Sequence, residues 1–268
     1  MSHVAAGRLW VGVGLLAAIA LLALIGPGLD GWPAGQVHLA LANLPPGARH
    51  PFGTDALGRD TFSRTWQGAR LSLLVGLAAV LLDLGVGAVY GALAGFAGGA
   101  LDQALMRVVD VLYGVPSLLV AIFLVTVRGP GLGTLILAIA TVNWLGMARL
   151  VRGQVLSLRR REWVLASRGL GLRPSQVLWR HVLPHVAGPA LAWLSFSLPQ
   201  AIFAEAFLSF LGLGVQPPLA SWGSLISLGS ASLLINPYPL LFPSAALVLT
   251  LLGCHLVADG LGADGARP

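Results

Sequence analysis

Three acidic residues lie within or beside long apolar stretches, where a charge is costly. Asp83 interrupts one apolar run, Glu205 lies inside another, and Asp110 stands at the edge of a third. Ionisable side chains inside membrane-spanning segments commonly face a pathway or a partner rather than lipid. We expect Asp83 and Glu205 to line a pathway, to pair with a neighbouring subunit or to accept structural hydrogen bonds. Asp110 is expected to pair with Arg107 or with the arginine-rich segment described below.

The other polar residues do not indicate catalysis. No Ser/His/Asp set and no paired carboxylates stand out, and the six histidines do not cluster, so no metal site is expected. All sixteen basic residues are arginines. A phosphate-binding P-loop requires a lysine, so any ATP and Mg²⁺ used with this chain must be bound by another subunit. We therefore expect a non-catalytic chain without a cofactor of its own.

Composition indicates a polytopic membrane protein. The 268 residues are 56% hydrophobic and 10% charged, whereas soluble domains carry about 25% charged residues. A soluble fold would have too little polar surface, and disorder is excluded by the hydrophobicity. The formal charge of +6 does not indicate a nucleic-acid-binding protein, because arginines near a membrane have another explanation.

The apolar runs predict an all-α protein with six transmembrane helices, since about 20 apolar residues cross a bilayer. An N-terminal helix in residues 1–29 precedes an outer segment, 30–70, and a five-helix core, 71–260. The expected spans are Leu9–Leu29, Leu71–Gly98, Val111–Val127, Gly133–Val151, Ala187–Leu211 and Leu240–Ala258. Pro116 and Pro199 should kink their spans, because proline lacks an N–H donor.

The outer segment is predicted to hold an amphipathic helix on the membrane surface. Thr54 or Asp55 is a suitable N-cap, and Asp60 and Arg64 have the i,i+4 spacing of a helical ion pair. Such a helix could be a packing device or a docking surface.

Arginine distribution predicts the orientation. With six spans, eleven arginines, including Arg267, fall on the side of both termini, and five fall on the other. Positive residues accumulate on the cytoplasmic side, so both termini and the connection 152–186 are expected in the cytoplasm.

The arginine-rich connection is predicted to form a helix, a tight turn and a second helix. Gly169 and Gly171 in "GLGLRPS" permit a reversal that a side chain would hinder, and Pro174 suits the first turn of the next helix. An ordinary charged loop would also satisfy the arginine bias.

This connection resembles the "EAA" coupling loop of ABC importer permeases. Leu165-Ala166-Ser167, Gly171 and Leu183-Pro184 have its spacing, and Glu162 matches a further acidic position of peptide-type permeases. Leu165 replaces the usual Glu, and His181 replaces an Ile. The residues that the resemblance assigns to the loop are Glu162, Ala166, Ser167, Arg168, Gly169, Leu170, Gly171, Leu172, Leu183 and Pro184.

Further motifs resemble the dipeptide/oligopeptide/nickel permease family, and within it the C-type subunit. They are "HPFGTDALGRDTFSRTWQGARLSLLVGL", "GALAGFAGG", "DQALMRVVDVLYGVP" and "AEAFLSFLGLGVQPPLASWG". The resemblance implies a type I ABC importer permease fold in the bacterial inner membrane. It also implies four kinds of partner: a B-type permease, two ATP-binding subunits, an extracytoplasmic solute-binding protein and the lipid bilayer.

The expected function is peptide import coupled to ATP hydrolysis on the partner subunits. Import of nickel or a metallophore complex by the same architecture is an alternative. A stand-alone secondary transporter or channel is a second alternative, and it would have only Asp83 and Glu205 for an ion path.

Overall fold

Ten α-helices carry most of residues 3–29 and 31–265, the part of the chain that the computed structural model describes. No β-strand occurs among these residues, and Arg267 lies outside them. The helices are α1 (His3–Ile25), α2 (Thr61–Ala97), α3 (Gly99–Tyr113), α4 (Ser117–Arg128), α5 (Leu132–Leu158), α6 (Glu162–Gly169), α7 (Pro174–Val177), α8 (Leu183–Phe210), α9 (Trp222–Ala231) and α10 (Tyr238–Gly265).

Five helices are long and apolar enough to cross a membrane, and a bent pair supplies a sixth crossing. α3 and α4 meet at an angle of 81°, so the third predicted span, 111–127, is sharply bent near Pro116, as the kink predicted there requires. The break lies at Pro116, which cannot donate the hydrogen bond that would continue α3. Pro199, in contrast, lies inside the continuous helix α8. With the bent pair counted as one span, the six-span architecture is confirmed.

The predicted amphipathic surface helix is not present in the described residues 31–60. Residues 61–70 are helical, but they are the first turns of α2. Asp60, rather than Thr54 or Asp55, is the N-cap, and its carboxylate accepts the Ser63 N–H at 2.7 Å. Asp55 accepts the backbone N–H groups of Leu57 and Arg59, which folds this stretch into a turn instead of a helix. The predicted pairing of Asp60 with Arg64 is also wrong, since Arg64 lies 3.7 Å from Asp55.

A stripe of glycines brings α2 close to α5. Gly87, Gly91 and Gly95 lie at four-residue intervals, and a Cβ built on Gly91 would stand 2.2 Å from the carbonyl oxygen of Ala148. Small residues at this spacing let two membrane helices approach until their backbones touch. The part of the core next to the α5–α8 connection packs around this contact and includes Met147, Val151 and Val155.

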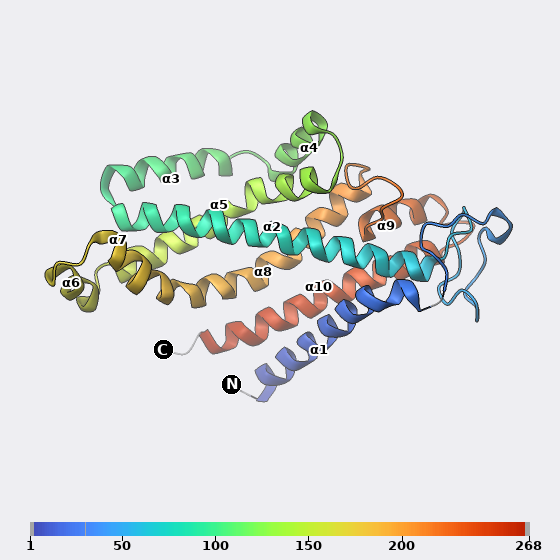
Figure 1. The fold of residues 1–268 in the computed structure, drawn as a ribbon, viewed down its shortest axis with the longest axis horizontal. Helices are drawn as coiled ribbons and strands as arrows, with labels where there is room; N and C mark the ends of the chain where they lie inside the picture. The colour runs from blue at the N-terminus through green and yellow to red at the C-terminus, as the bar shows by residue number, and fades with distance from the viewer. Residues whose placement is uncertain (1–2, 30, 266–268) are drawn as a thin grey trace.

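The two ends of the molecule differ in construction (Figure 1). α6 and α7 lie at one end, and both chain termini are directed toward it. The 31–60 segment and α9 lie at the opposite end. α1 packs chiefly against α10, with Gly12 near the backbone of Gly253. The six-span arrangement thus has the termini and the arginine-rich connection on one side, as an even number of crossings requires.

Candidate coupling loop and intramembrane pathway

The connection between α5 and α8 folds as a helix, a left-handed turn and a second short helix. Gly171 has φ +83°, and its N–H donates to the Arg168 carbonyl at 3.0 Å, while the Leu172 N–H donates to the Ser167 carbonyl at 3.3 Å. These two bonds form a Schellman motif, in which a glycine with positive φ ends a helix. The tight turn predicted from the sequence is therefore present, and Gly171 has the left-handed backbone conformation in it.

The underside of this turn is fixed to the membrane helices. Val164 of α6 and Val177 of α7 are fully buried in the cluster formed by α2, α5 and α8. The Trp163 ring stacks on His185 at 4.8 Å between centroids, which joins α6 to α8. Arg159 donates to the Gly95 carbonyl at 3.0 Å, which joins the end of α5 to α2. The turn is thus in contact with α2, α5 and α8.

The outer side of the turn is exposed and partly apolar. Leu165 is 54% exposed and Leu170 is 85% exposed, because no other part of the described chain covers them. Apolar side chains displayed on an ordered protrusion are typical of a protein-binding surface. The structure brings the predicted loop residues from Glu162 to Leu172 together in α6 and the turn that follows it. Leu183 and Pro184 lie apart from them, in the first turn of α8, after the π-helical turn Leu178–Val182.

α3 is fastened to α5 by two ion pairs. Asp102 receives two hydrogen bonds from Arg152, at 2.5 and 2.8 Å, and Asp110 receives one from Arg149 at 2.8 Å. Arg149 also lies over the ring of Tyr113, 4.2 Å from its centroid. Asp110 therefore pairs with neither Arg107 nor the arginine-rich connection, because Arg149 of α5 lies within hydrogen-bonding distance of it.

Asp83 is enclosed between α2 and α5. Asp83 lies one helical turn before Gly87 in the same stripe, and the residue is 1% exposed. Neither carboxylate oxygen has a hydrogen bond within the described part of the chain. The side chain of Asn143 lies near the carboxylate without forming a hydrogen bond of good geometry. A buried polar group without a partner is costly and often belongs to a functional site.

Glu205 has a different environment, which favours the structural alternative. The residue is completely buried, and its oxygens accept from Ser72 at 2.6 Å and from Ser209 at 2.7 Å. The Ser72 hydroxyl also accepts a hydrogen bond from the backbone N–H of Trp222 at 3.2 Å. Glu205 thus links α2, α8 and α9 and does not meet Asp83 or Asp110.

A polar cavity of about 270 Å³ lies at the break between α3 and α4. Its hydrogen-bonding side chains are neutral, and they come from α3, α4, α5 and α8: Tyr113, Ser117, Asn143, Trp193, Ser197 and Gln200. A second cavity, of about 260 Å³, shares Ser117 and Asn143 and continues along Phe203 and Phe207. Polar groups at membrane depth face water or protein rather than lipid, so these cavities mark a candidate pathway.

Sequence reasoning missed this cavity because no charged residue lines it. The only signal was the helix-breaking Pro116, which adjoins Ser117 and opens the space between α3 and α4. Asn143 connects the two parts of the site, since it lines both cavities and also lies near Asp83.

Comparison with known proteins agrees with this architecture. Residues 87–263 match the family described as "Binding-protein-dependent transport system inner membrane component". The chain is 45% identical to the Oligopeptide transport system permease protein OppC of Bacillus subtilis over 251 residues, which cover 94% of this chain and 82% of that protein.

Two further relatives are similar over comparable lengths. Identity is 45% with the Dipeptide transport system permease protein DppC of Bacillus subtilis, over 93% of this chain and 78% of that protein. It is 41% with the OppC protein of Escherichia coli K12, over 92% of this chain and 82% of that protein. With its several membrane-spanning helices, this chain belongs to the family of inner-membrane components of binding-protein-dependent transport systems.

Proposed function

We propose that this chain is the C-type permease subunit of an ATP-driven importer of di- or oligopeptides. The observation that carries the proposal is the ordered turn at Gly171, which is exposed on its outer side and fixed to α2, α5 and α8 on its inner side. A docking partner that pushed this turn would move the membrane helices with it. The relatives named for oligopeptide and dipeptide transport support the substrate class.

The partners follow from this role. A B-type permease would complete the pathway, two ATP-binding subunits would seat the coupling turns, and an extracytoplasmic solute-binding protein would deliver the substrate. ATP and Mg²⁺ would bind to the ATP-binding subunits, and this chain would contribute no catalytic residue. Both termini and the turn would lie in the cytoplasm, which the arginine distribution supports.

The transmission of movement can be derived from the contacts. Closure of the ATP-binding subunits would displace α6, and the buried Val164 would carry that displacement into α5 and α8. Because Asp102 and Asp110 bind arginines of α5, α3 would follow α5. The break at Pro116 would absorb the change of angle, and the polar cavity beside it would alternate between open and closed states.

The lining of the two cavities favours peptides over nickel or a metallophore. Their polar side chains are hydroxyls, amides and an indole, with no His, Cys, Asp or Glu among the lining residues. Neutral donors and acceptors suit peptide bonds, which all peptides share, whereas transition metals prefer imidazole, thiolate or carboxylate ligands.

Reconstitution tests the proposal directly. The four membrane and ATP-binding subunits in lipid vesicles, with the binding protein outside, should accumulate labelled di- or tripeptides only when ATP is present. ATP-independent uptake, or selective uptake of nickel, would contradict the assignment.

The same vesicles test the coupling turn with two matched variants. Gly171→Val and Gly169→Val add the same bulk at positions where a Cβ meets nothing within 4 Å, but only Gly171 has a positive φ. A branched residue in that conformation costs roughly 1–3 kcal/mol, so Gly171→Val should distort the turn. We expect Gly171→Val to lose docking of the ATP-binding subunits or substrate-stimulated ATP hydrolysis, while Gly169→Val retains both. Loss of docking or of stimulated hydrolysis in both variants would show that bulk matters rather than the turn. Retention of both properties in Gly171→Val would contradict the role of the turn.

A further inference from the structure

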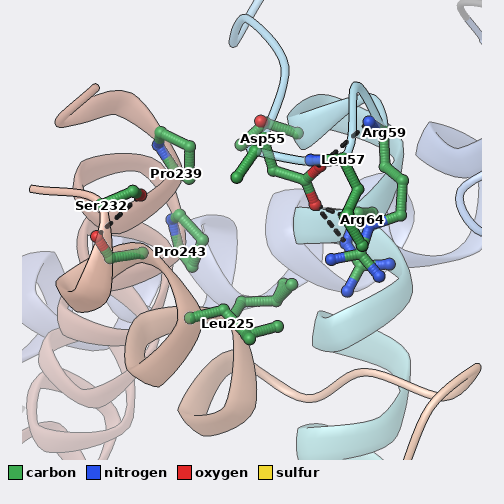
Figure 2. A pocket seen from close by; sticks show the side chains of 12 residues that line it. Asp55, Leu57, Arg59, Arg64, Leu225, Ser232, Pro239 and Pro243 are labelled. Carbon is green, nitrogen blue, oxygen red and sulfur yellow. Dashed lines mark hydrogen bonds and ion pairs between the residues drawn. The ribbon is translucent and has the colours of Figure 1, made fainter. Parts of the chain in front are cut away.

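A small cavity of about 120 Å³ lies at the end of the molecule opposite the coupling turn (Figures 1 and 2). It separates the beginning of α2 from α9 and α10. In Figure 2 the charged side chains of Asp55, Arg59 and Arg64 lie opposite Leu225 and Pro243, and Thr61 also lines the cavity. Engineered cavities of about 150 Å³ hold a benzene molecule, so this pocket has room for a small ligand group.

The polar side carries one positive charge more than it carries negative charges. Arg59 Nε contacts Asp55 Oδ2 at 2.7 Å, and Arg64 Nε lies 3.7 Å from the same oxygen. Arg59 and Asp55 are the charged groups that act on Arg64, so two guanidinium groups share one carboxylate. The Arg64 side chain is only 5% exposed. Burying an uncompensated charge is costly, and an anion in the adjoining cavity would offset that cost.

Two buried donors on this side have no hydrogen-bond acceptor among the described residues. Thr61 Oγ1 makes no hydrogen bond there, and Arg64 Nε, 3.7 Å from Asp55 Oδ2, forms an ion pair but no hydrogen bond; each of the two residues is only 4% exposed. Arg64 uses Nη1 to donate to the Ala34 carbonyl at 3.2 Å, which holds the guanidinium in place. Buried donors in native proteins are nearly always satisfied, so a ligand that accepts from both groups would complete the site.

We propose that this pocket binds one anionic oxygen group, a carboxylate or a phosphate, that carries a short apolar substituent. A single negative charge would neutralise the excess charge of Arg59 and Arg64, and its oxygens would accept from Thr61 and Arg64. The substituent would lie against Leu225 and Pro243. A phospholipid headgroup and a small soluble anion both supply this chemistry. The site is remote from the coupling turn, and the proposal does not depend on the substrate being a peptide.

The test uses the intact transporter in nanodiscs of phosphatidylcholine. Native mass spectrometry measures retention of dihexanoyl-phosphatidylglycerol against dihexanoylglycerol, which lacks the phosphate, and ligand-observed NMR measures binding of butyrate and inorganic phosphate against butyramide. We expect saturable binding of anionic probes and none of the neutral ones. Binding of the anionic lipid alone identifies a headgroup site, and binding of butyrate or phosphate identifies a site for soluble anions. Failure of every anionic probe to bind, or equal binding of charged and neutral probes, would overturn the proposal.

Matched variants locate the binding to this pocket. Arg59→Gln removes the excess charge and should weaken binding of the anionic probe by roughly tenfold, whereas Arg59→Lys retains the charge and should weaken it less. Thr61→Val removes a hydroxyl that has no partner, so it should weaken binding without lowering thermal stability. Unchanged affinity in both Arg59→Gln and Thr61→Val would refute the assignment. If Arg59→Gln fails to fold, Thr61→Val and the comparison of charged with neutral probes still decide the question.

Discussion

The close contact between α2 and α5 can be tested with one substitution made at two positions of the same helix. A Cβ on Gly91 would stand 2.2 Å from the Ala148 carbonyl oxygen, whereas a Cβ on Gly85 would meet nothing within 4 Å. An ordinary contact needs about 3.4 Å, so Gly91→Ala must separate the helices by roughly 1 Å. Overpacking of this kind costs about 1–3 kcal/mol. Gly85→Ala should be neutral or stabilising by up to about 1 kcal/mol, since alanine favours a helix more than glycine does.

The single cysteine of the chain provides the assay. Cys254 is 3% exposed, so a thiol-reactive fluorescent dye should label it only when the protein unfolds. With a cysteine-free partner permease, the temperature of labelling reports the stability of each variant. We expect Gly91→Ala to unfold several degrees below wild type and Gly85→Ala at or above it. Equal unfolding temperatures would refute the inference that the glycine stripe sets the distance between α2 and α5.

Three further predictions concern the pathway and the topology. Asp83→Leu should assemble normally but transport poorly if the buried carboxylate serves the pathway beside Asn143; full uptake by this variant in reconstituted vesicles would assign Asp83 no role in transport. Asp102→Arg should impair uptake by releasing α3 from α5, and the exchanged pair Asp102→Arg/Arg152→Asp should restore part of it; absence of any rescue would mean that the ion pair itself is not what joins the helices. A cysteine at Arg160 should be labelled by a membrane-impermeant reagent only from the cytoplasm, and labelling of that site in intact cells would contradict the proposed orientation.

Patterns that repeat along the chain were sufficient to predict the general architecture. Long apolar runs predicted the number of spans, and the glycines of "GLGLRPS" predicted the tight turn in which Gly171 lies. These features depend on local sequence, because span length and backbone conformation at a glycine are set by neighbouring residues.

Features that depend on contacts between distant residues were not predicted. Asp55 was expected to cap a helix, but it binds Arg59 and Arg64 and folds into a turn. Asp110 was expected to pair with Arg107 or with the arginine-rich connection, but it pairs with Arg149 of α5. A polar side chain can form hydrogen bonds or ion pairs with several different partners. Only the packing of the helices determines which of these partners lies within reach. The polar cavity was missed for the same reason, since its neutral side chains come from four helices.

The pairing of α1 with α10 has a consequence for biogenesis. α1 is synthesised long before α10, but α10 is its main packing partner among the described helices. Until the ribosome has produced α10, the face of α1 around Gly12 must be covered by lipid or by a membrane chaperone. A ribosome that stalls before α10 would therefore leave α1 without its main packing partner. The fold of the described chain is thus closed only by a contact between helices that are made at very different times.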